Sequence, residues 1–337
     1  MEGNFTMEPK KSRRREWMNL LFMHVILLAA ALLVTSFGCS GGQSASGEKH
    51  YTVGICQLVQ HEALDAATKG FCDVLTEKLG DRVTFVSQNA SGDPATCSVI
   101  CTQLVGEEVD LIMANATPAL QAAQSATNKI PVLGTSITDY GAALEIDNWS
   151  GATGTNISGT SDRVPEEEQA KVLQTLFPNA KTVGILYCSA EANSKLQAEA
   201  FSAAAEAMGY SVSAYTFADS NDVAQITAQA CGECDVLYIP TDNTAASNAE
   251  LIGNVALENK TPIVCGEEGL CRKCGVATVS ITYYELGRVT GEMAYEILVN
   301  GSDPATMEIR YAPFDRKYNP DLCEKLGITV PDGFTAM

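Results

Sequence analysis

Short runs of hydrophobic residues that end in polar ones recur along this chain. One of them is Val236–Ile239, which stops at Pro240, a residue with no N–H to donate to a sheet. A run without polar residues is typical of a strand buried on both faces of a parallel sheet. Ligands of open α/β sheets bind beyond the carboxyl ends of such strands, so Thr241, Asp242 and Asn243 are candidate ligand contacts. The alternative is that Asp242 or Asn243 only caps a following helix.

The same order of runs occurs twice, which indicates an internal duplication. Three strand-like runs of the first half have counterparts in the second half: 53–57 with 183–187, 109–118 with 234–243, and 129–134 with 260–266. Helical stretches lie between the runs, and this alternation is typical of βαβ units around a parallel sheet. We therefore predict an α/β protein of two similar Rossmann-like lobes with parallel sheets.

Hydrophobic residues at helical spacing predict a helix over 62–79, and two further helices are predicted over 93–105 and 118–127. Thr117 is expected to be the N-cap of the third helix, with Pro118 as its first residue. The free N–H groups of such a helix end suit an anion such as a carboxylate.

Further polar residues follow other predicted strands. Gln57 ends the first strand, His61 lies in the loop after it, and Asn193 opens a helix predicted over 190–208. Because the carboxyl ends of parallel strands share one edge of a sheet, these residues are expected to meet in one site. The predicted ligand-binding residues are Gln57, His61, Thr117, Asp139, Asn193, Thr241, Asp242, Asn243 and Glu267.

The pattern of residues 1–39 predicts an export signal. A basic segment around 10–15 precedes a hydrophobic stretch that ends near Phe37. Cys39 directly follows Gly38, which resembles a bacterial lipobox, so Cys39 is the expected site of lipid attachment; an uncleaved membrane anchor is the alternative. Residues 40–50 are predicted to be a flexible tether. We expect the folded part outside the cytoplasmic membrane and held to it.

Composition narrows the possible functions. The chain has 41 Asp and Glu against 22 Lys and Arg, a formal net charge of -19, which disfavours nucleic acid as a partner. None of the motifs G-x-S-x-G, H-E-x-x-H or Walker A is present. Beyond His50 the only histidine is His61. A single histidine offers little basis for a catalytic nucleophile–histidine pair and none for a multi-histidine metal site. We therefore expect that the protein is not an enzyme and that it binds neither a cofactor nor a metal.

Twelve cysteines are many for an exported protein. They include two C-x-x-C pairs, Cys231 with Cys234 and Cys271 with Cys274, which would suit a zinc site or a thiol-redox site. The gap between the pairs is longer than zinc ribbons prefer, and nothing thioredoxin-like surrounds them. Local disulfides or free thiols are the favoured interpretation, and a thiol-redox protein is the alternative.

A set of short motifs carries a family resemblance over residues 51–331. In chain order they are V-G-I-C-Q, H-E-A-L-D, Q-N-A-S-G-D, A-T-P-A-L-Q-A, N-A-K-T-V-G-I-L-Y, E-A-N-S, Y-I-P-T-D-N-T, G-E-E-G and Y-Y-E-L-G. Together they resemble the ABC-transporter substrate-binding lipoproteins that bind tryptophan, tyrosine or phenylalanine. The resemblance implies a type I periplasmic-binding-protein fold, with three crossings joining the lobes and a permease and an ATPase as partners. The chain departs from the family pattern at Glu62, where proline is usual, and at Cys271 and Cys274.

The late strand at 277–281 and the helix after it are expected to return to the first half. The predicted lobes are 51–157 plus 279–308 and 158–278 plus 309–337, with the first crossing in 151–162.

The candidate residues also favour a class of ligand. Carboxylates at Asp242 and Glu267 suit an ammonium group, and the helix end at Thr117 suits a carboxylate. A sugar needs neither charge and stacks on aromatic faces, whereas the exported part has only one tryptophan, Trp149. An α-amino acid is therefore predicted, and the resemblance narrows it to an aromatic one; a nucleoside or a sugar is the alternative.

Overall fold

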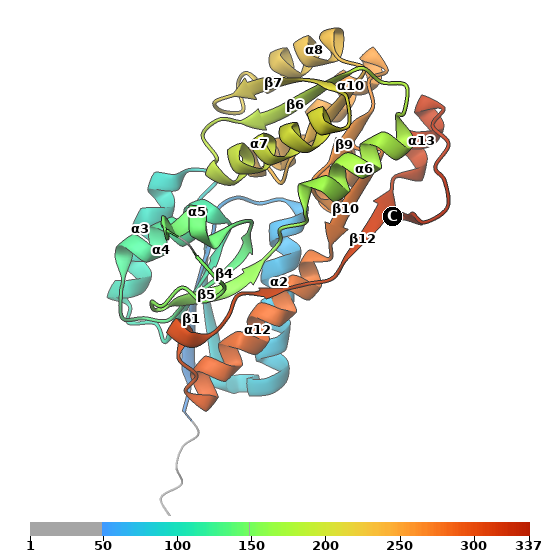
Figure 1. Ribbon diagram of the computed structural model, residues 1–337. Helices are drawn as coiled ribbons and strands as arrows, with labels where there is room; N and C mark the ends of the chain where they lie inside the picture. The colour runs from blue at the N-terminus through green and yellow to red at the C-terminus, as the bar shows by residue number, and fades with distance from the viewer. Residues whose placement is uncertain (1–48, 148) are drawn as a thin grey trace, which may run out of the picture. The chain divides into compact units, whose positions relative to one another are not determined.

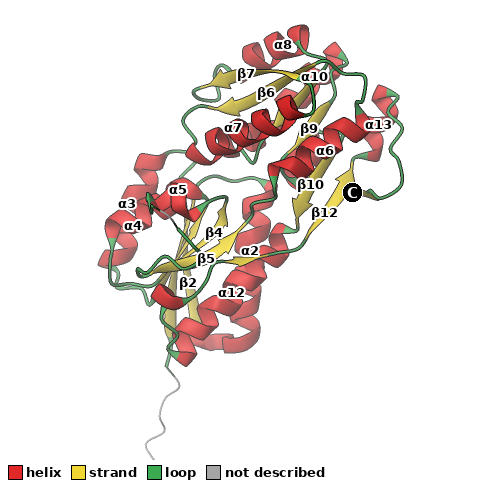
Figure 2. Cartoon of the chain, in the orientation of Figure 1, coloured by secondary structure: helices red, strands yellow, loops and turns green. Residues whose placement is uncertain are grey.

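The computed structural model describes residues 49–147 and 149–337. The predicted export signal, Cys39 and tether residues 40–48 lie outside the described residues. In the described part, the chain forms two β-sheets with helices on both faces of each (Figures 1 and 2).

The first sheet has six strands in the order β11-β5-β4-β3-β1-β2, all parallel. Its interior strands consist almost wholly of buried residues, as expected of a sheet covered on both faces. The strands are β1 (Tyr51–Gln57), β2 (Val83–Asn89), β3 (Leu111–Asn115), β4 (Val132–Ile137), β5 (Ile157–Ser161) and β11 (Arg310–Tyr311).

The second sheet has seven strands in the order β13-β12-β10-β9-β8-β6-β7. All neighbours are parallel except β10 and β12, which pair antiparallel. The strands are β6 (Thr182–Cys188), β7 (Ser211–Phe217), β8 (Val236–Ile239), β9 (Ile263–Cys265), β10 (Ala277–Ile281), β12 (Phe314–Tyr318) and β13 (Thr335–Ala336).

Helices complete each lobe, and we use lobe 1 and lobe 2 for the first and second sheets with their helices. Lobe 1 contains α2 (Glu62–Leu79), α3 (Pro94–Gly106), α4 (Thr117–Ala126), α5 (Tyr140–Leu144) and α12 (Tyr283–Asn300), with the 3₁₀ turns η1 (Gly80–Arg82) and η2 (Pro304–Thr306). Lobe 2 contains α6 (Glu166–Leu176), α7 (Ala192–Ala207), α8 (Val223–Glu233), α9 (Asn243–Ser247), α10 (Ala249–Asn259), α11 (Glu268–Cys274) and α13 (Pro320–Leu326).

The hydrophobic core of each lobe has two parts, one on each face of its sheet. In lobe 1, residues of α3 and α4 pack on one face, and α2 and α12 pack on the other. In lobe 2, α6 and α7 cover one face, and α8, α10 and α11 cover the other. This arrangement confirms the predicted fold of two Rossmann-like α/β lobes.

The chain passes between the two sheets three times in the described part, after β5, after β10 and between β11 and β12. The strand β10 pairs with β9 and β12, so it belongs to the second sheet, which corrects the expectation that this strand returns to the first half. All five residues of β10 are buried in this sheet, and the chain leaves the sheet after Ile281. The helix α12 that follows does return, and it packs against α2 (Figure 1).

The other two crossings also differ from the expected positions. The segment 151–162 was expected to be a crossing, but it contains β5, which pairs with β4 in the first sheet. The polar residues of β5 are buried, and the Thr160 hydroxyl lies 2.8 Å from that of Thr290. The short strand β11 pairs with β5, so lobe 1 extends to Tyr311 rather than to 308.

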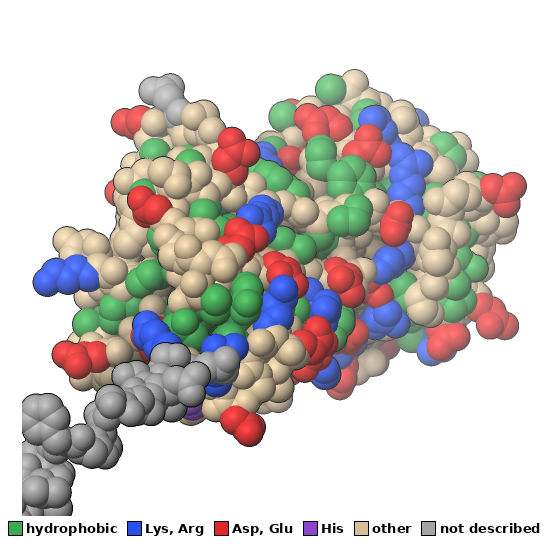
Figure 3. Space-filling model, turned by 90° about the horizontal axis from the view of Figure 1, so that it is seen from below, with side chains coloured by type: hydrophobic (Ala, Val, Ile, Leu, Met, Phe, Trp, Pro, Cys, Tyr) green, Lys and Arg blue, Asp and Glu red, His purple; other side chains and the backbone are tan. Residues whose placement is uncertain are grey.

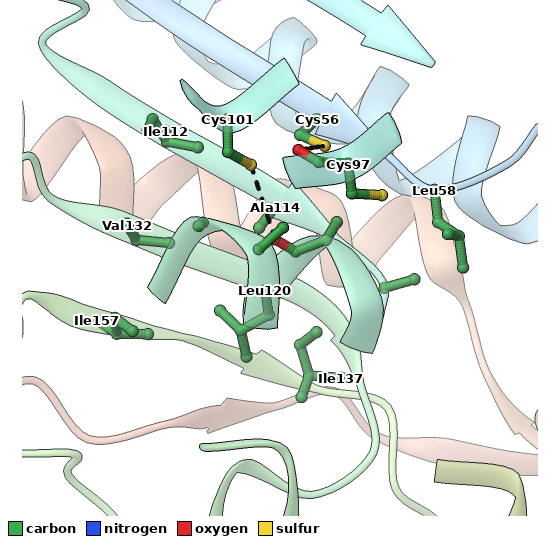
Figure 4. Close-up of a cluster of buried hydrophobic side chains, with 14 of the residues drawn as sticks. Cys56, Leu58, Cys97, Cys101, Ile112, Ala114, Leu120, Val132, Ile137 and Ile157 are labelled. Atoms are coloured by element: carbon green, nitrogen blue, oxygen red, sulfur yellow. Dashed lines mark hydrogen bonds between the residues drawn. The ribbon is translucent and has the colours of Figure 1, made fainter. Parts of the chain in front are cut away.

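Many of the cysteines serve as small core residues. Figure 4 shows Cys56, Cys97 and Cys101 among the aliphatic side chains between β1, α3 and α4. All eleven cysteines of the described residues are free thiols, and nine of them are buried. Among the described residues no group of His, Cys, Asp or Glu could hold a metal ion.

Charges on the surface are mixed rather than segregated. On the face drawn in Figure 3, lysine and arginine side chains lie next to aspartate and glutamate. Ion pairs such as Lys78 with Glu292, 2.8 Å apart, and Arg310 with Glu296, 2.7 Å apart, follow this pattern. No helix in the described part is long and apolar enough to span a bilayer.

Candidate ligand-binding site

A small polar cavity lies between the lobes, where loops after several parallel strands meet. Its volume is about 10 Å³, and it is lined by residues from both lobes. Its position is the one at which open α/β sheets bind ligands. The lining residues are His61, Leu64, Ser136, Thr138, Asp162, Asn193, Thr241, Asp242, Asn243, Ala246, Glu267 and Tyr283.

Three buried polar atoms of the cavity wall have no hydrogen-bond partner in the protein. They are Nδ1 of His61, Oγ of Ser136 and Oδ1 of Asn193, and these residues are 9%, 7% and 7% exposed. A buried polar group without a partner costs about 1–3 kcal/mol, so each such group calls for an explanation. Three of them around one cavity leave bonding positions that a polar group of about the size of a water molecule would fill.

The charge of the cavity wall is negative. It includes the carboxyl groups of Asp162, Asp242 and Glu267, and no lysine or arginine of the described residues lines it. Burial raises the pKa of Asp242 and of Glu267 to about 7, and it also raises the pKa of Asp162. The negative charge of Glu191 adds to the effect of burial on the pKa of Asp242. A cationic group in the cavity would offset these charges.

A chain of hydrogen bonds joins the lobes beside the cavity. Nε2 of His61, in lobe 1, lies 3.2 Å from Oδ1 of Asn243, in lobe 2. Nδ2 of Asn243 donates to Glu191 at 2.7 Å, so Oδ1 is the oxygen that faces the histidine. His61 therefore donates from Nε2, and burial lowers its pKa, which leaves Nδ1 as an acceptor in the neutral ring.

Glu191 organises the loop after β8. Its two carboxylate oxygens accept four hydrogen bonds, from the backbone and side chain of Asn243 and from the backbone and side chain of Thr244, at 2.7–3.0 Å. The sequence interpretation did not assign Glu191 to the site. Its signal was its place in the E-A-N-S motif after β6, directly before the observed start of α7.

Asp162 lies where the chain first leaves lobe 1. It accepts hydrogen bonds from the Thr138 hydroxyl at 3.2 Å and from the Tyr283 hydroxyl at 2.8 Å. Gln197 of α7 donates in turn to the Thr138 hydroxyl at 2.9 Å. This network, which also was not predicted, brings together β4, the first crossing, α7 and the start of α12.

The predicted residues Asp242 and Glu267 reach the cavity, but both also cap helices. Asp242 accepts the N–H groups of Ala245 and Cys188, each at 2.7 Å. Glu267 accepts the N–H groups of Gly269 and Leu270. The capping alternative is therefore realised at Asp242, and Glu267 caps α11, which was not expected. Of the other predicted residues, His61, Asn193, Thr241 and Asn243 line the cavity.

Three predicted residues lie outside the cavity wall. The Gln57 side chain is bonded within lobe 1, to Val59, Asp65 and Thr68. Asp139 caps α5 and pairs with Arg163 at 2.7 Å.

Thr117 is the third of these residues, and it is the first residue of α4 rather than its N-cap. The N-cap is Ala116, and no side chain caps this helix. The backbone of Ala116 has φ 87°, a conformation that a residue with a Cβ rarely adopts, and Ser136 at the end of β4 has φ 57°. Such strain is concentrated at ligand sites, and both residues lie at the sheet edge that faces the cleft.

A larger pocket adjoins the cavity along the cleft. It has a volume of about 270 Å³ and shares Asn243 with the cavity. Residues of both lobes line it, including Leu58, Val59 and Pro118 of lobe 1 and Cys188 and Ala190 of lobe 2. A ligand with a polar end and an apolar end would therefore find a polar cavity and a partly apolar pocket next to each other.

Two α/β lobes around a polar cleft define a binding protein of the type I periplasmic class. The chain belongs to the family described as ABC transporter substrate binding protein, whose model matches residues 52–336. It is 37% identical over 286 residues to a tyrosine-binding protein of Clostridioides difficile (strain R20291), covering 81% of this chain and 83% of that protein.

Two solved structures extend the comparison. One is an ABC domain in complex with L-Trp from Streptococcus pneumonia, with a TM-score of 0.81 and 32% identity over 86% of this chain and 100% of that one. The other is the ligand-free, open structure of a substrate binding protein with adhesive properties from Clostridium difficile. Its TM-score is 0.65 and its identity 36%, over 85% of this chain and 99% of that one.

Proposed function

We propose that this chain is the extracytoplasmic receptor of an ABC importer and that it captures an aromatic amino acid in the cleft between its lobes. The observation that carries the proposal is the acceptor-rich cavity, in which His61, Ser136 and Asn193 each present an unpaired buried polar atom. An amino acid has an ammonium group for this cavity and a side chain for the adjoining pocket.

The chemistry of the cavity favours an amine over a sugar. Asp162, Asp242 and Glu267 surround it with carboxylates, and a sugar would offset none of their charge. The neighbouring pocket of about 270 Å³ has room for a side chain. The relatives that bind tyrosine and L-Trp support an aromatic one.

The remaining parts of the proposal concern place and partners. Export by the segment 1–39, with lipid attachment at Cys39, would hold the receptor at the outer face of the cytoplasmic membrane. A permease and an ATPase are the partners expected of a substrate-binding protein. The thiol-redox alternative is not favoured, because burial raises the pKa of Cys231, Cys234 and Cys271, and reactive thiols need a lowered pKa.

A thermal-shift screen tests the proposal. The purified protein would be heated with each of the twenty amino acids, with nucleosides and with ribose. A ligand at about a hundred times its Kd stabilises the folded state by about 2.7 kcal/mol, which raises the midpoint by a few degrees. We expect shifts from tyrosine, tryptophan or phenylalanine, confirmed by titration calorimetry. A shift from ribose or a nucleoside, with none from any amino acid, would contradict the proposal.

A further inference from the structure

The three carboxyl groups of the cavity differ in what already compensates their charge. Asp242 and Glu267 each accept two backbone N–H groups, one or both of them at the start of a helix. Such N–H groups carry partial positive charge and stabilise a carboxylate. Both side chains therefore have a structural partner, apart from any ligand.

Asp162 has no such compensation from a neighbouring helix end. Its side chain accepts from the hydroxyls of Thr138 and Tyr283 and is also near its own backbone N–H, and none of the ion pairs among the described residues includes it. The residue is only 5% exposed. These groups still leave part of the acceptor capacity of the carboxylate unused.

We propose that Asp162 is the counter-ion of the ligand's ammonium group, and that Thr138 and Tyr283 hold its carboxylate in place. This assignment rests on the proposed function and replaces Asp242 and Glu267 as the expected ionic partners. Nδ1 of His61 and Oδ1 of Asn193 are the further acceptors in the same cavity wall. With Asp162 they provide three acceptors for the three N–H groups of a primary ammonium.

The donors already present fix the orientation of both neutral acceptors. Nδ2 of Asn193 donates to the carbonyl oxygen of Thr241 at 2.8 Å, so Oδ1 is the atom left for the ligand. The bond from His61 to Asn243 assigns the proton to Nε2 and leaves the lone pair on Nδ1. Neither acceptor can be replaced by a donor without breaking one of these bonds.

The position of Asp162 links recognition to closure of the lobes. Thr138 follows β4 of lobe 1, whereas Gln197, which donates to it, belongs to α7 of lobe 2. Asn193 also belongs to α7, and His61 belongs to lobe 1. An ammonium bound by this trio therefore contacts both lobes and the segment between them.

The test compares a ligand with its deaminated analogue in two variants. Affinities of L-tyrosine and 3-(4-hydroxyphenyl)propionate would be measured by calorimetry for the wild-type protein, for Asp162→Asn and for Asp235→Asn. Asp235 is the matched control, because its carboxylate is also hydrogen-bonded but to Lys181 and Thr182, away from the cavity wall. We expect Asp162→Asn to weaken tyrosine binding about a hundredfold or more and the analogue less than threefold. We expect Asp235→Asn to change neither.

Different results would overturn different statements. Unchanged tyrosine affinity in Asp162→Asn, or equal losses for tyrosine and the analogue, would overturn the assignment of the counter-ion and leave the proposed function intact. If the wild-type protein binds no amino acid at all, the proposed function and this inference both fail. Tyr283→Phe provides a second variant should Asp162→Asn not fold, with an expected loss of about tenfold for tyrosine alone. An equal loss for the analogue would again overturn the assignment.

Discussion

Replacing Gly287 by alanine should separate two helices that this protein packs unusually closely. A Cβ at position 287 of α12 would lie 1.9 Å from the carbonyl oxygen of Ala67 in α2. The contact is reciprocal, since a Cβ at Gly70 of α2 would lie 2.1 Å from the carbonyl oxygen of Tyr284 in α12. Neither obstacle is a flexible side chain, so the backbone itself must move.

The size of the effect follows from these distances. Real Cβ atoms essentially never lie within 3.0 Å of a heavy atom from another part of the chain. To remove the clash at position 287, the two helices must therefore move apart by about 1 Å. Overpacking of this kind typically costs 1–3 kcal/mol. Alanine regains about 0.5–1 kcal/mol over glycine inside a helix. The second effect subtracted from the first, at the middle of each range, leaves about 1 kcal/mol, so we expect Gly287→Ala to lower the free energy of unfolding by about 1 kcal/mol.

Urea unfolding followed by circular dichroism measures this loss. Gly232→Ala in α8 is the control, because its Cβ would meet no atom within 4 Å, and it should raise stability by about 0.5–1 kcal/mol. Tyr283 begins α12 and lines the cavity, so Gly287→Ala should also weaken ligand binding. Equal urea midpoints for the two variants would refute the close-packing argument.

Three further predictions concern the site and the thiols. Glu191→Ala leaves four donors without their acceptor and should cost about 3 kcal/mol of stability, whereas Glu191→Gln should cost less; equal urea midpoints would argue against the network. The pKa values of Asp242 and Glu267 are raised to about 7 from 3.8 and 4.5, so the folded state binds protons at a pH where the unfolded state does not. Stability without ligand should therefore rise as the pH falls from about 7 to about 4, while affinity for an amine falls. Thermal scans across this range measure the stability and calorimetry measures the affinity; the opposite trend in either would contradict the prediction. Cys72 and Cys234 are the only half-buried thiols among the described residues, and burial raises the pKa of both, so Ellman's reagent should react slowly with no more than about two thiols in the native protein and rapidly with all free thiols after denaturation.

The interior of both sheets could be predicted from the sequence because its strands are hydrophobic throughout. Runs such as the one in β8 can be recognised from their hydrophobic residues alone, because a strand covered on both faces has no polar face. The repetition of these runs indicated two similar lobes. The edge strands β2 and β7 were missed, since their side chains are largely exposed and mixed in polarity. The strand β5 was missed because buried threonine and serine in a polar segment become strand residues only through partners far along the chain.

The candidate site was predictable only in part, for a related reason. Loop residues after strands identify the correct edge of each sheet, and His61, Asn193 and Asp242 were found in this way. Which side chain points into the cleft depends on tertiary partners: Asp139 meets Arg163, whereas Asp162 meets Tyr283, more than a hundred residues later. The sequence contains no local signal that separates these two aspartates.

The three passages of the chain between the lobes also affect how the protein would withstand proteolysis. After a single cut in any one of these segments, the two remaining segments still join the lobes covalently. The segments are far apart in sequence, so a protease has to find three separate sites before the halves can diffuse apart. An extracytoplasmic substrate-binding protein built in this way would therefore retain its cleft after the first cleavage, provided that each lobe keeps its core.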